Sequence, residues 1–459
     1  MYKRILSLFL LMFSIFFLVI SCKSTDVVPK TKQEFTVDFA QKLQEVLRNG
    51  TIEEALALFE TMPEKYQNDY SMNLLHASLL VSSGNIEKAT ILADKLEVIE
   101  PGNIDTLVLK SMIAKASGDK KAKSEILKQI IEKDPTNVDA NVELANDQMV
   151  RRNFKLANSY YGKSLEKEPN NEQALLGYGQ SAYYNDDLKK ARTSFEKLIE
   201  VNPENSFGWA YLGKLEGDDE NYAVATRHIE KALKLDPYYY DYWVDYGRYL
   251  YYQGKFTDAE KAWSKAISIE PDNFYAYIYR SALYDEQKRF ADALNDYKKI
   301  IEVKPEYYYA YESIGILAWH EKKYDEARKA FLSAYKYNKD NISYPMMVSA
   351  TYLKEGNNTE NKKFLTNVLK NRDIKTATYS VIRLYYDGLN PAAVGTRIKN
   401  ESNVNLRGKL MFYLAMYHDI LGDDLNAKKY YNEIVKLQAP MFFEYRLAEW
   451  ALDDLQNQF

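Results

Sequence analysis

Apolar side chains recur along this chain at helical spacing, and the whole pattern repeats after 34 residues. In one copy Ala191, Phe195 and Ile199 stand four residues apart, and Ala225 and Ile229 hold the first two of these positions in the next copy. Residues four apart lie on one side of an α-helix, so each copy predicts a helix with a single apolar face.

A second helix is predicted ahead of the first in each copy. A small residue recurs at the same interval, at Gly179, Gly213, Gly247, Ser281 and Gly315. Four residues earlier stands a large apolar one, at Leu175, Trp209, Trp243, Tyr277 and Tyr311. Two antiparallel helices approach closely where their crossing carries small residues, and large side chains fill the space beside it. Each copy therefore predicts a helix–turn–helix pair.

Prolines mark the copies at residues 101, 135, 169, 203, 237, 271 and 305. Proline disfavours a helical conformation of the preceding residue, so it ends the second helix. Asn103, Asn137 and Asn171 follow their prolines by two residues and are good N-caps for the next helix. Gly84 and Gly118 fall in the turn between paired helices, where a positive φ is often needed. A fixed period of this length indicates one supersecondary unit that is copied and stacked.

The copy at 206–239 resembles the tetratricopeptide repeat, whose signature runs Trp-x2-Leu-Gly-x2-Tyr, then Ala-x3-Phe, then Pro. The matching positions are Trp209, Leu212, Gly213, Tyr222, Ala225 and Pro237. The resemblance covers nearly everything after residue 35. It implies an all-α fold, a right-handed superhelical solenoid of about 11–12 helix–turn–helix units. Such a stack presents long surfaces for gripping other molecules and supplies no catalytic chemistry by itself.

The period also divides the chain. The main solenoid is predicted over 36–375, and the register then breaks in 376–407, an irregular or degenerate repeat in which Gly388, Pro391 and Gly395 suggest a loop. A further repeat is predicted over 408–441. Residues 442–459 are expected to form a capping helix that covers the last apolar face.

Residues 1–21 differ from the rest of the chain. Lys3 and Arg4 precede an apolar run from Ile5 to Ile20, which is followed by Ser21 and Cys22, as in a secretory signal peptide. The run is shorter than the roughly 20 residues that span a bilayer, so a retained membrane anchor is the weaker reading. Cys22, the only cysteine, is placed as in the bacterial lipobox, and this resemblance implies its lipidation. Residues 22–35 would then be the lipidated cysteine and a flexible tether, with the solenoid facing the periplasm or the cell surface.

Charge and motifs narrow the classes of function. The net charge is −4, and removal of 1–21 with its two basic residues would make it −6. Both signs are interspersed and no basic block appears, so no nucleic-acid partner is expected. His76, His228, His320 and His418 are isolated, without metal-ligand spacing. We expect no cofactor, no metal and no enzyme activity.

The family resemblance also implies where a partner binds. In tetratricopeptide proteins the first helix of each pair lines a groove, and fixed positions on it touch a bound peptide. Carried over to this sequence, those positions are Asn146, Gln180, Tyr184, Lys214, Arg248, Tyr251, Tyr252, Tyr275, Tyr309 and Trp319. Amides and cations can bind an extended backbone, and tyrosines can flank it.

Two functions stay open at this point. The first is a lipid-anchored scaffold that holds protein or peptide partners at the bacterial cell envelope. The second is a ligand-binding subunit of a periplasmic solute-uptake system, which predicts a bound small molecule. No residue of the sequence supports such a ligand specifically.

Overall fold

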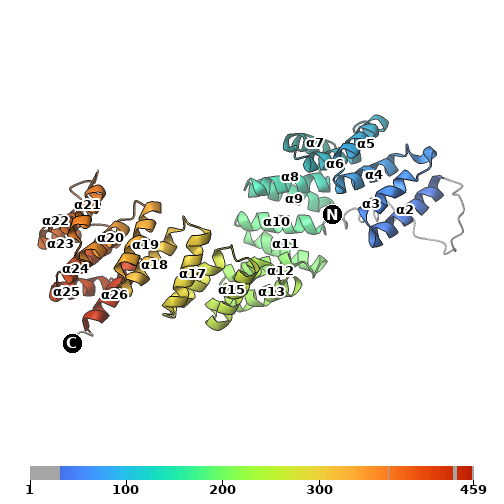
Figure 1. Ribbon diagram of the computed structural model, residues 1–459. Coiled ribbons are helices and arrows are strands. Elements are labelled where there is room, and N and C mark those ends of the chain that lie inside the picture. The colour runs from blue at the N-terminus through green and yellow to red at the C-terminus, as the bar shows by residue number, and fades with distance from the viewer. Residues whose placement is uncertain (1–31, 371, 438–441, 457–459) are drawn as a thin grey trace. The chain divides into compact units, whose positions relative to one another are not determined.

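The computed structural model describes residues 32–370, 372–437 and 442–456, and this part of the chain holds helices and no strand. The leader predicted over 1–21 and the lipidation site Cys22 lie outside the described residues. The chain divides into two compact units, residues 1–215 and 216–459 (Figure 1).

The helices of the first unit are short and regular. They are α2 (Lys32–Asn49), α3 (Ile52–Glu60), α4 (Tyr70–Ser82), α5 (Ile86–Ile99), α6 (Ile104–Ala116), α7 (Lys120–Lys133), α8 (Val138–Val150), α9 (Phe154–Lys167), α10 (Glu172–Tyr184) and α11 (Leu188–Val201). One turn of 3₁₀-helix, Glu64–Tyr66, precedes α4. Helix α12 (Ser206–Asp218) crosses the boundary between the units.

The second unit continues the same alternation. It contains α13 (Tyr222–Leu235), α14 (Tyr240–Tyr252), α15 (Phe256–Ile269), α16 (Tyr275–Glu286), α17 (Phe290–Val303), α18 (Tyr308–His320), α19 (Tyr324–Tyr337), α20 (Ser343–Lys354), α21 (Asn358–Leu369), α22 (Ala377–Asp387), α23 (Pro391–Lys399), α24 (Val404–Ile420), α25 (Asp424–Val435) and α26 (Phe443–Gln456). Read in order, α2 to α25 make twelve helix–turn–helix pairs, in agreement with the all-α repeat prediction.

Within each unit a helix packs mainly on its neighbours in sequence. The first unit accordingly holds several small apolar clusters, each shared by a few consecutive helices. In the second unit the cluster around Trp263 is of this kind, whereas a larger one extends from α18 to α26. This chain of local cores is the packing expected of stacked repeats.

The predicted crossing of the paired helices is confirmed at Gly179 and Gly315. A Cβ added to Gly179 would lie 2.5 Å from the ring of Phe195, and one added to Gly315 would lie 2.8 Å from the ring of Phe331. Both rings are fully buried. The large residue of the second helix therefore presses directly on the backbone of the first, and only glycine leaves room for it.

The turn between paired helices has the same backbone conformation in copy after copy. A positive φ of 59–80° recurs every 34 residues, at Gly84, Gly118, Arg152, Asp186, Glu220, Gly254, Lys288, Lys322 and Gly356. Several copies therefore place an ordinary side chain where glycine is conformationally easier.

The asparagine caps are also confirmed. The side chains of Asn103, Asn137 and Asn171 accept hydrogen bonds from backbone N–H groups in the first turns of α6, α8 and α10. These bonds satisfy donors that a helix N-terminus otherwise leaves unpaired.

Two predictions from the sequence are wrong, one about where the first helix begins and one about a loop after residue 375. Helix α2 begins at Lys32, so residues 32–35 are not part of a tether, and the ring of Phe35 stacks on Tyr66 at 4.1 Å. The loop expected around Gly388, Pro391 and Gly395 is instead helical in α22 and α23. Gly388 is the left-handed C-cap of α22, and Pro391 occupies the first turn of α23, where proline is well tolerated.

Candidate partner-binding surface

Four exposed tyrosines lie on the first helices of three successive pairs in the second unit. They are Tyr252 on α14, Tyr275 and Tyr279 on α16, and Tyr309 on α18, and we refer to them as the tyrosine row. Tyr252, Tyr275 and Tyr309 are 55, 55 and 52% exposed, and Tyr279 is 37% exposed. Exposed aromatic rings on consecutive repeats form a repeated contact surface of the kind enriched at protein interfaces.

Each ring of the row rests on another aromatic ring. Tyr252 stacks on Tyr222 at 4.7 Å, and Tyr279 stacks on the buried Trp263 at 5.6 Å. Tyr309 lies 4.2 Å from Tyr308, and Tyr275 lies 4.5 Å from Phe274. The row is thus an exposed layer on a fixed aromatic base, so its side chains lose little freedom when a partner binds.

The rings lie within electrostatic reach of one another. Burial raises the pKa of Tyr279, and the charged or phenolic groups that act on it are Arg248, Asp245, Tyr252 and Tyr275. Burial likewise raises the pKa of Tyr307, whose phenolic neighbours are Tyr309, Tyr275 and Tyr279. The phenols of Tyr279 and Tyr307 therefore stay protonated near neutral pH and can donate hydrogen bonds.

Arg248 and Tyr251 border the row and are tied to neighbouring side chains. The Arg248 guanidinium donates to Asp245 at 3.0 Å and lies 5.0 Å from the centre of the Tyr249 ring. The Tyr251 hydroxyl donates to Glu286 on α16 at 2.7 Å, and this bond raises the pKa of Tyr251 to about 12. The bond joins α14 to α16 and fixes the spacing of two first helices under the row.

The first unit holds four of the sequence-predicted groove residues. Tyr184 is exposed and stacks on Phe154 at 5.0 Å. Lys214 is half-buried and lies 5.1 Å from the centre of the Tyr183 ring. Gln180 is half-buried on α10.

Asn146 is engaged inside the first unit. Its side-chain oxygen accepts a hydrogen bond of 2.6 Å from the hydroxyl of the buried Tyr161. This bond serves the packing of α8 on α9, which the sequence pattern did not reveal.

Trp319 does not extend the row. It is half-buried, and its ring meets the edge of Tyr324 at 5.2 Å. It also packs against the large apolar cluster at the end of the second unit. Its contacts are those of a packing residue, and a role in partner binding stays a prediction.

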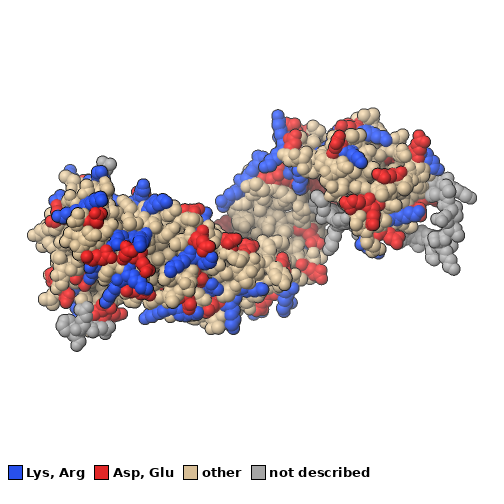
Figure 2. Space-filling view, in the orientation of Figure 1, with Lys and Arg blue, Asp and Glu red and all other residues tan. Residues whose placement is uncertain are grey.

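The surface around these sites is mixed in charge. Figure 2 shows Lys and Arg interspersed with Asp and Glu over the visible face of each unit. The described residues hold no group of three or more His, Cys, Asp or Glu side chains placed to bind a metal ion. Across 32–370, 372–437 and 442–456, no helix combines the length and the apolar character needed to cross a membrane.

Comparison with solved structures finds short relatives of the repeat array. A tetratricopeptide repeat protein from Parabacteroides merdae is 20% identical, with 54% of this chain and 98% of that chain covered and a TM-score of 0.41. YrrB, described as a TPR protein with an unusual peptide-binding site, is 21% identical over 43% of this chain and 97% of its own, with a TM-score of 0.34. PilF of Pseudomonas aeruginosa is 16% identical over 45% and 94%, with a TM-score of 0.41.

Comparison with protein families gives the more direct result. No curated protein matches the chain. The tetratricopeptide repeat family matches residues 142–206, 211–274, 247–301 and 280–341. These matches and the repeated helical pairs show that the chain is an all-α protein that contains tetratricopeptide repeats.

Proposed function

We propose that this chain is a scaffold that binds protein or peptide partners, and that the tyrosine row is one of its contact surfaces. The observation that carries the proposal is the repetition of exposed tyrosines on the first helices of successive repeats. A tyrosine offers a large ring and a hydroxyl while losing only two rotatable bonds, so it contributes contact area at low entropic cost.

The chemistry of the row fits an extended peptide or a segment of mixed polarity. The rings can flank apolar side chains, and the hydroxyls can donate to backbone carbonyls. The Arg248–Asp245 pair beside the row offers both a cation and an anion at its edge. Binding through such a surface depends on shape and hydrogen bonding more than on net charge.

A pull-down from the native cell tests the proposal. The bait is the full chain, compared with a variant that combines Tyr252→Ala, Tyr275→Ala and Tyr309→Ala. The matched control is Tyr238→Ala, because Tyr238 is 74% exposed but lies in the turn before α14, beside Lys265 of α15, and is not part of the row. We expect the triple variant to lose partners that the control keeps. Retention of every partner by the triple variant would refute a binding role for the row.

The proposal extends to location. The lone cysteine behind a basic and apolar leader supports lipidation at Cys22 and attachment to a bacterial envelope membrane. With several acyl chains, each buried CH₂ contributing about 0.8 kcal/mol, attachment would be effectively permanent. We expect Cys22→Ala to shift the protein from the membrane fraction to the soluble fraction, and mass spectrometry of the mature N-terminus to find an acylated cysteine. A mature chain that retains residues 1–21 would contradict this.

A further inference from the structure

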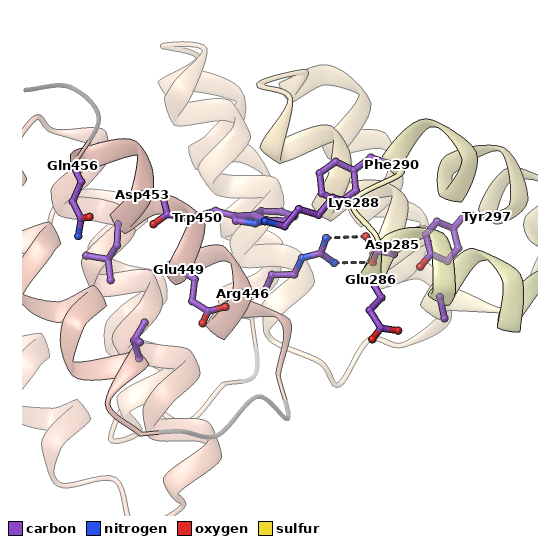
Figure 3. Close-up of a pocket in the computed structure, with 13 residues that line it drawn as sticks. Asp285, Glu286, Lys288, Phe290, Tyr297, Arg446, Glu449, Trp450, Asp453 and Gln456 are labelled. Carbon is purple, nitrogen blue, oxygen red and sulfur yellow. Dashed lines mark hydrogen bonds and ion pairs between the residues drawn. The ribbon is translucent and has the colours of Figure 1, made fainter. Parts of the chain in front are cut away.

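The last helix, α26, makes a contact that its place in the repeat order does not require. Besides packing on α24 and α25, it reaches back to α18. Arg446 of α26 also donates two hydrogen bonds, of 2.7 and 2.8 Å, to the carboxylate of Asp285 on α16 (Figure 3). These partners are 161 residues apart in sequence. Bidentate pairing of this kind is both strong and geometrically specific.

An aromatic group surrounds the ion pair. The Arg446 guanidinium lies 4.2 Å from the centre of the Trp450 ring and 5.7 Å from that of Phe290 on α17. Trp450 in turn stacks on His320 of α18 at 3.9 Å and meets Phe290 edge-on at 5.9 Å. Side chains from α16, α17 and α18 therefore form a seat for one arginine and one tryptophan of α26.

Helix α26 uses two different sides. Arg446, Trp450 and Asp454 follow one another at intervals of four and form a stripe along one side, with Asp454 3.8 Å from Lys322. Leu447, Ala448, Leu452 and Leu455 are buried on another side, in the apolar cluster shared with α24 and α25. Trp450 also packs against this cluster, whereas Arg446 and Asp454 make only the contacts of the stripe.

On α18 the seat lies on the same helix face as the tyrosine row. Tyr309 and His320 are eleven residues apart, about three helical turns, and so share one face. The N-terminal end of this face carries an exposed tyrosine, and its C-terminal end is covered by Trp450 of α26.

The contact with α16 is not close-packed. A pocket of about 820 Å³ separates α16 and α17 from α26, and Glu286, Lys288, Glu449 and Asp453 are among the residues that line it. On this side α26 is held by the tips of polar and aromatic side chains, whereas a packed protein interior leaves few voids larger than a water molecule.

We propose that the seat on α16–α18 is a helix-binding site that α26 occupies within its own chain, and that the external partner for this site is an amphipathic helix with an arginine and a tryptophan four residues apart. Asp285 selects the guanidinium, and Phe290 with His320 selects the indole. The intramolecular helix shields the site until a partner helix competes for it. The inference does not depend on the tyrosine row.

Direct binding tests the site. The probe is a labelled peptide of residues 443–456, and the opened chain is the full protein with Arg446→Ala and Trp450→Ala, which leaves the seat intact. We expect the opened chain to bind the probe at least about tenfold more tightly than the unmodified chain does, because the competing side chains are gone. Asp285→Ala in the opened chain should abolish this gain in affinity. Alanine at the positions of Arg446 and Trp450 in the probe should abolish it as well. Arg383→Ala, which breaks an Arg–Asp pair within α22, is the matched control and should leave binding unchanged.

Hydrogen exchange of α26 decides what a negative result means. If the α26 amides exchange faster in the opened chain and the probe still does not bind, the helix-binding site is refuted. If they exchange as slowly as in the unmodified chain, the stripe does not hold α26 and the proposal also fails. Self-association of the opened chain would identify a second copy as the occupant and overturn the assignment to a separate partner. If the double variant does not fold, two other measurements take its place. One is binding of the probe to the Arg446→Gln chain, and the other is hydrogen exchange of the α26 amides in the unmodified chain with saturating probe.

Discussion

Glu444 provides a sharp test of how α26 is held. Its side chain is fully buried on α26, and burial raises its pKa despite the nearby Lys409 of α24. The carboxylate of Glu312 on α18 lies within electrostatic reach, and burial raises the pKa of Glu312 as well. Two acids in one buried site favour the neutral form of both.

The hydrogen bonds around Glu444 favour the same state. The Tyr413 hydroxyl lies 2.9 Å from Glu444 Oε1 and 3.1 Å from the carbonyl oxygen of Ser343, but it has a single proton to donate. Glu444 Oε2 makes no hydrogen bond of good geometry, and burial raises the pKa of Glu444 more than the Ser343 hydroxyl and the Glu444 backbone N–H lower it. A protonated Glu444 can donate to Tyr413 while Tyr413 donates to Ser343, so the neutral acid satisfies groups that the carboxylate cannot.

We therefore predict that Glu444→Gln stabilises the second unit at high pH. A native pKa raised above the unfolded value makes stability greatest below the unfolded pKa, and this stability is lost as pH rises toward the native pKa. Glutamine stays neutral at every pH and can make the same contact with Tyr413. The expected gain at pH 8 is about 1–3 kcal/mol, the usual cost of a buried polar group left unpaired, and near pH 4 the gain should be close to zero.

Urea denaturation at several pH values, combined with hydrogen exchange of α26, measures this difference. Glu449→Gln is the matched control, because it removes the same charge from an exposed position on the same helix. It should change stability little at any pH. A Glu444→Gln chain that is no more stable than the unmodified chain at pH 8 would refute the assignment of a neutral Glu444.

Four further substitutions test the packing of the repeats. Gly179→Ala should destabilise the first unit by about 1–3 kcal/mol, because the new methyl group meets a buried phenylalanine ring. Gly162→Ala should instead stabilise it by about 0.5–1 kcal/mol, because the new methyl group would meet only the Tyr178 ring at an ordinary contact distance of 3.4 Å, and chemical denaturation compares the two. Arg152→Gly should gain up to about 1 kcal/mol in the same assay, since the residue has φ of 59°. Asp296→Ala should cost about 3 kcal/mol, because it leaves the half-buried Arg280 without the carboxylate that it binds at 2.8 Å; loss of little or no stability would show that this pair is dispensable.

The repeat architecture could be predicted because its signals are local and periodic. A small residue such as Gly179 and a large one such as Phe195 recur in step, and their contact in the structure is the one their sizes demand. The turns were predictable for the same reason at Gly84. At Arg152 the equivalent turn forms without glycine, so its position could be inferred only from the period.

The region after residue 375 shows where local signals mislead. The sequence predicts a loop at Gly388 and Pro391, but each is at a helix end, where the same residue types are favoured. Without the period to set the register, a helix terminus and a loop have the same composition.

The features of the candidate sites could likewise be predicted only where they follow from the repeat period. The exposure of Tyr275 follows from its helix face, which the period determines. The engagement of Asn146 by Tyr161 and the pairing of Arg446 with Asp285 depend on which side chains meet in three dimensions. No spacing in the sequence encodes a contact between residues 161 positions apart.

Site-specific photo-crosslinking in the native cell tests the central claim most directly. A photoreactive benzoylphenylalanine is placed at Tyr275 in the row or at the more exposed Tyr238, and the adducts are identified by mass spectrometry. A scaffold that binds through the row should give discrete protein adducts from position 275 and none of these from position 238. Identical adduct patterns from the two positions, or no protein adduct from position 275, would contradict it.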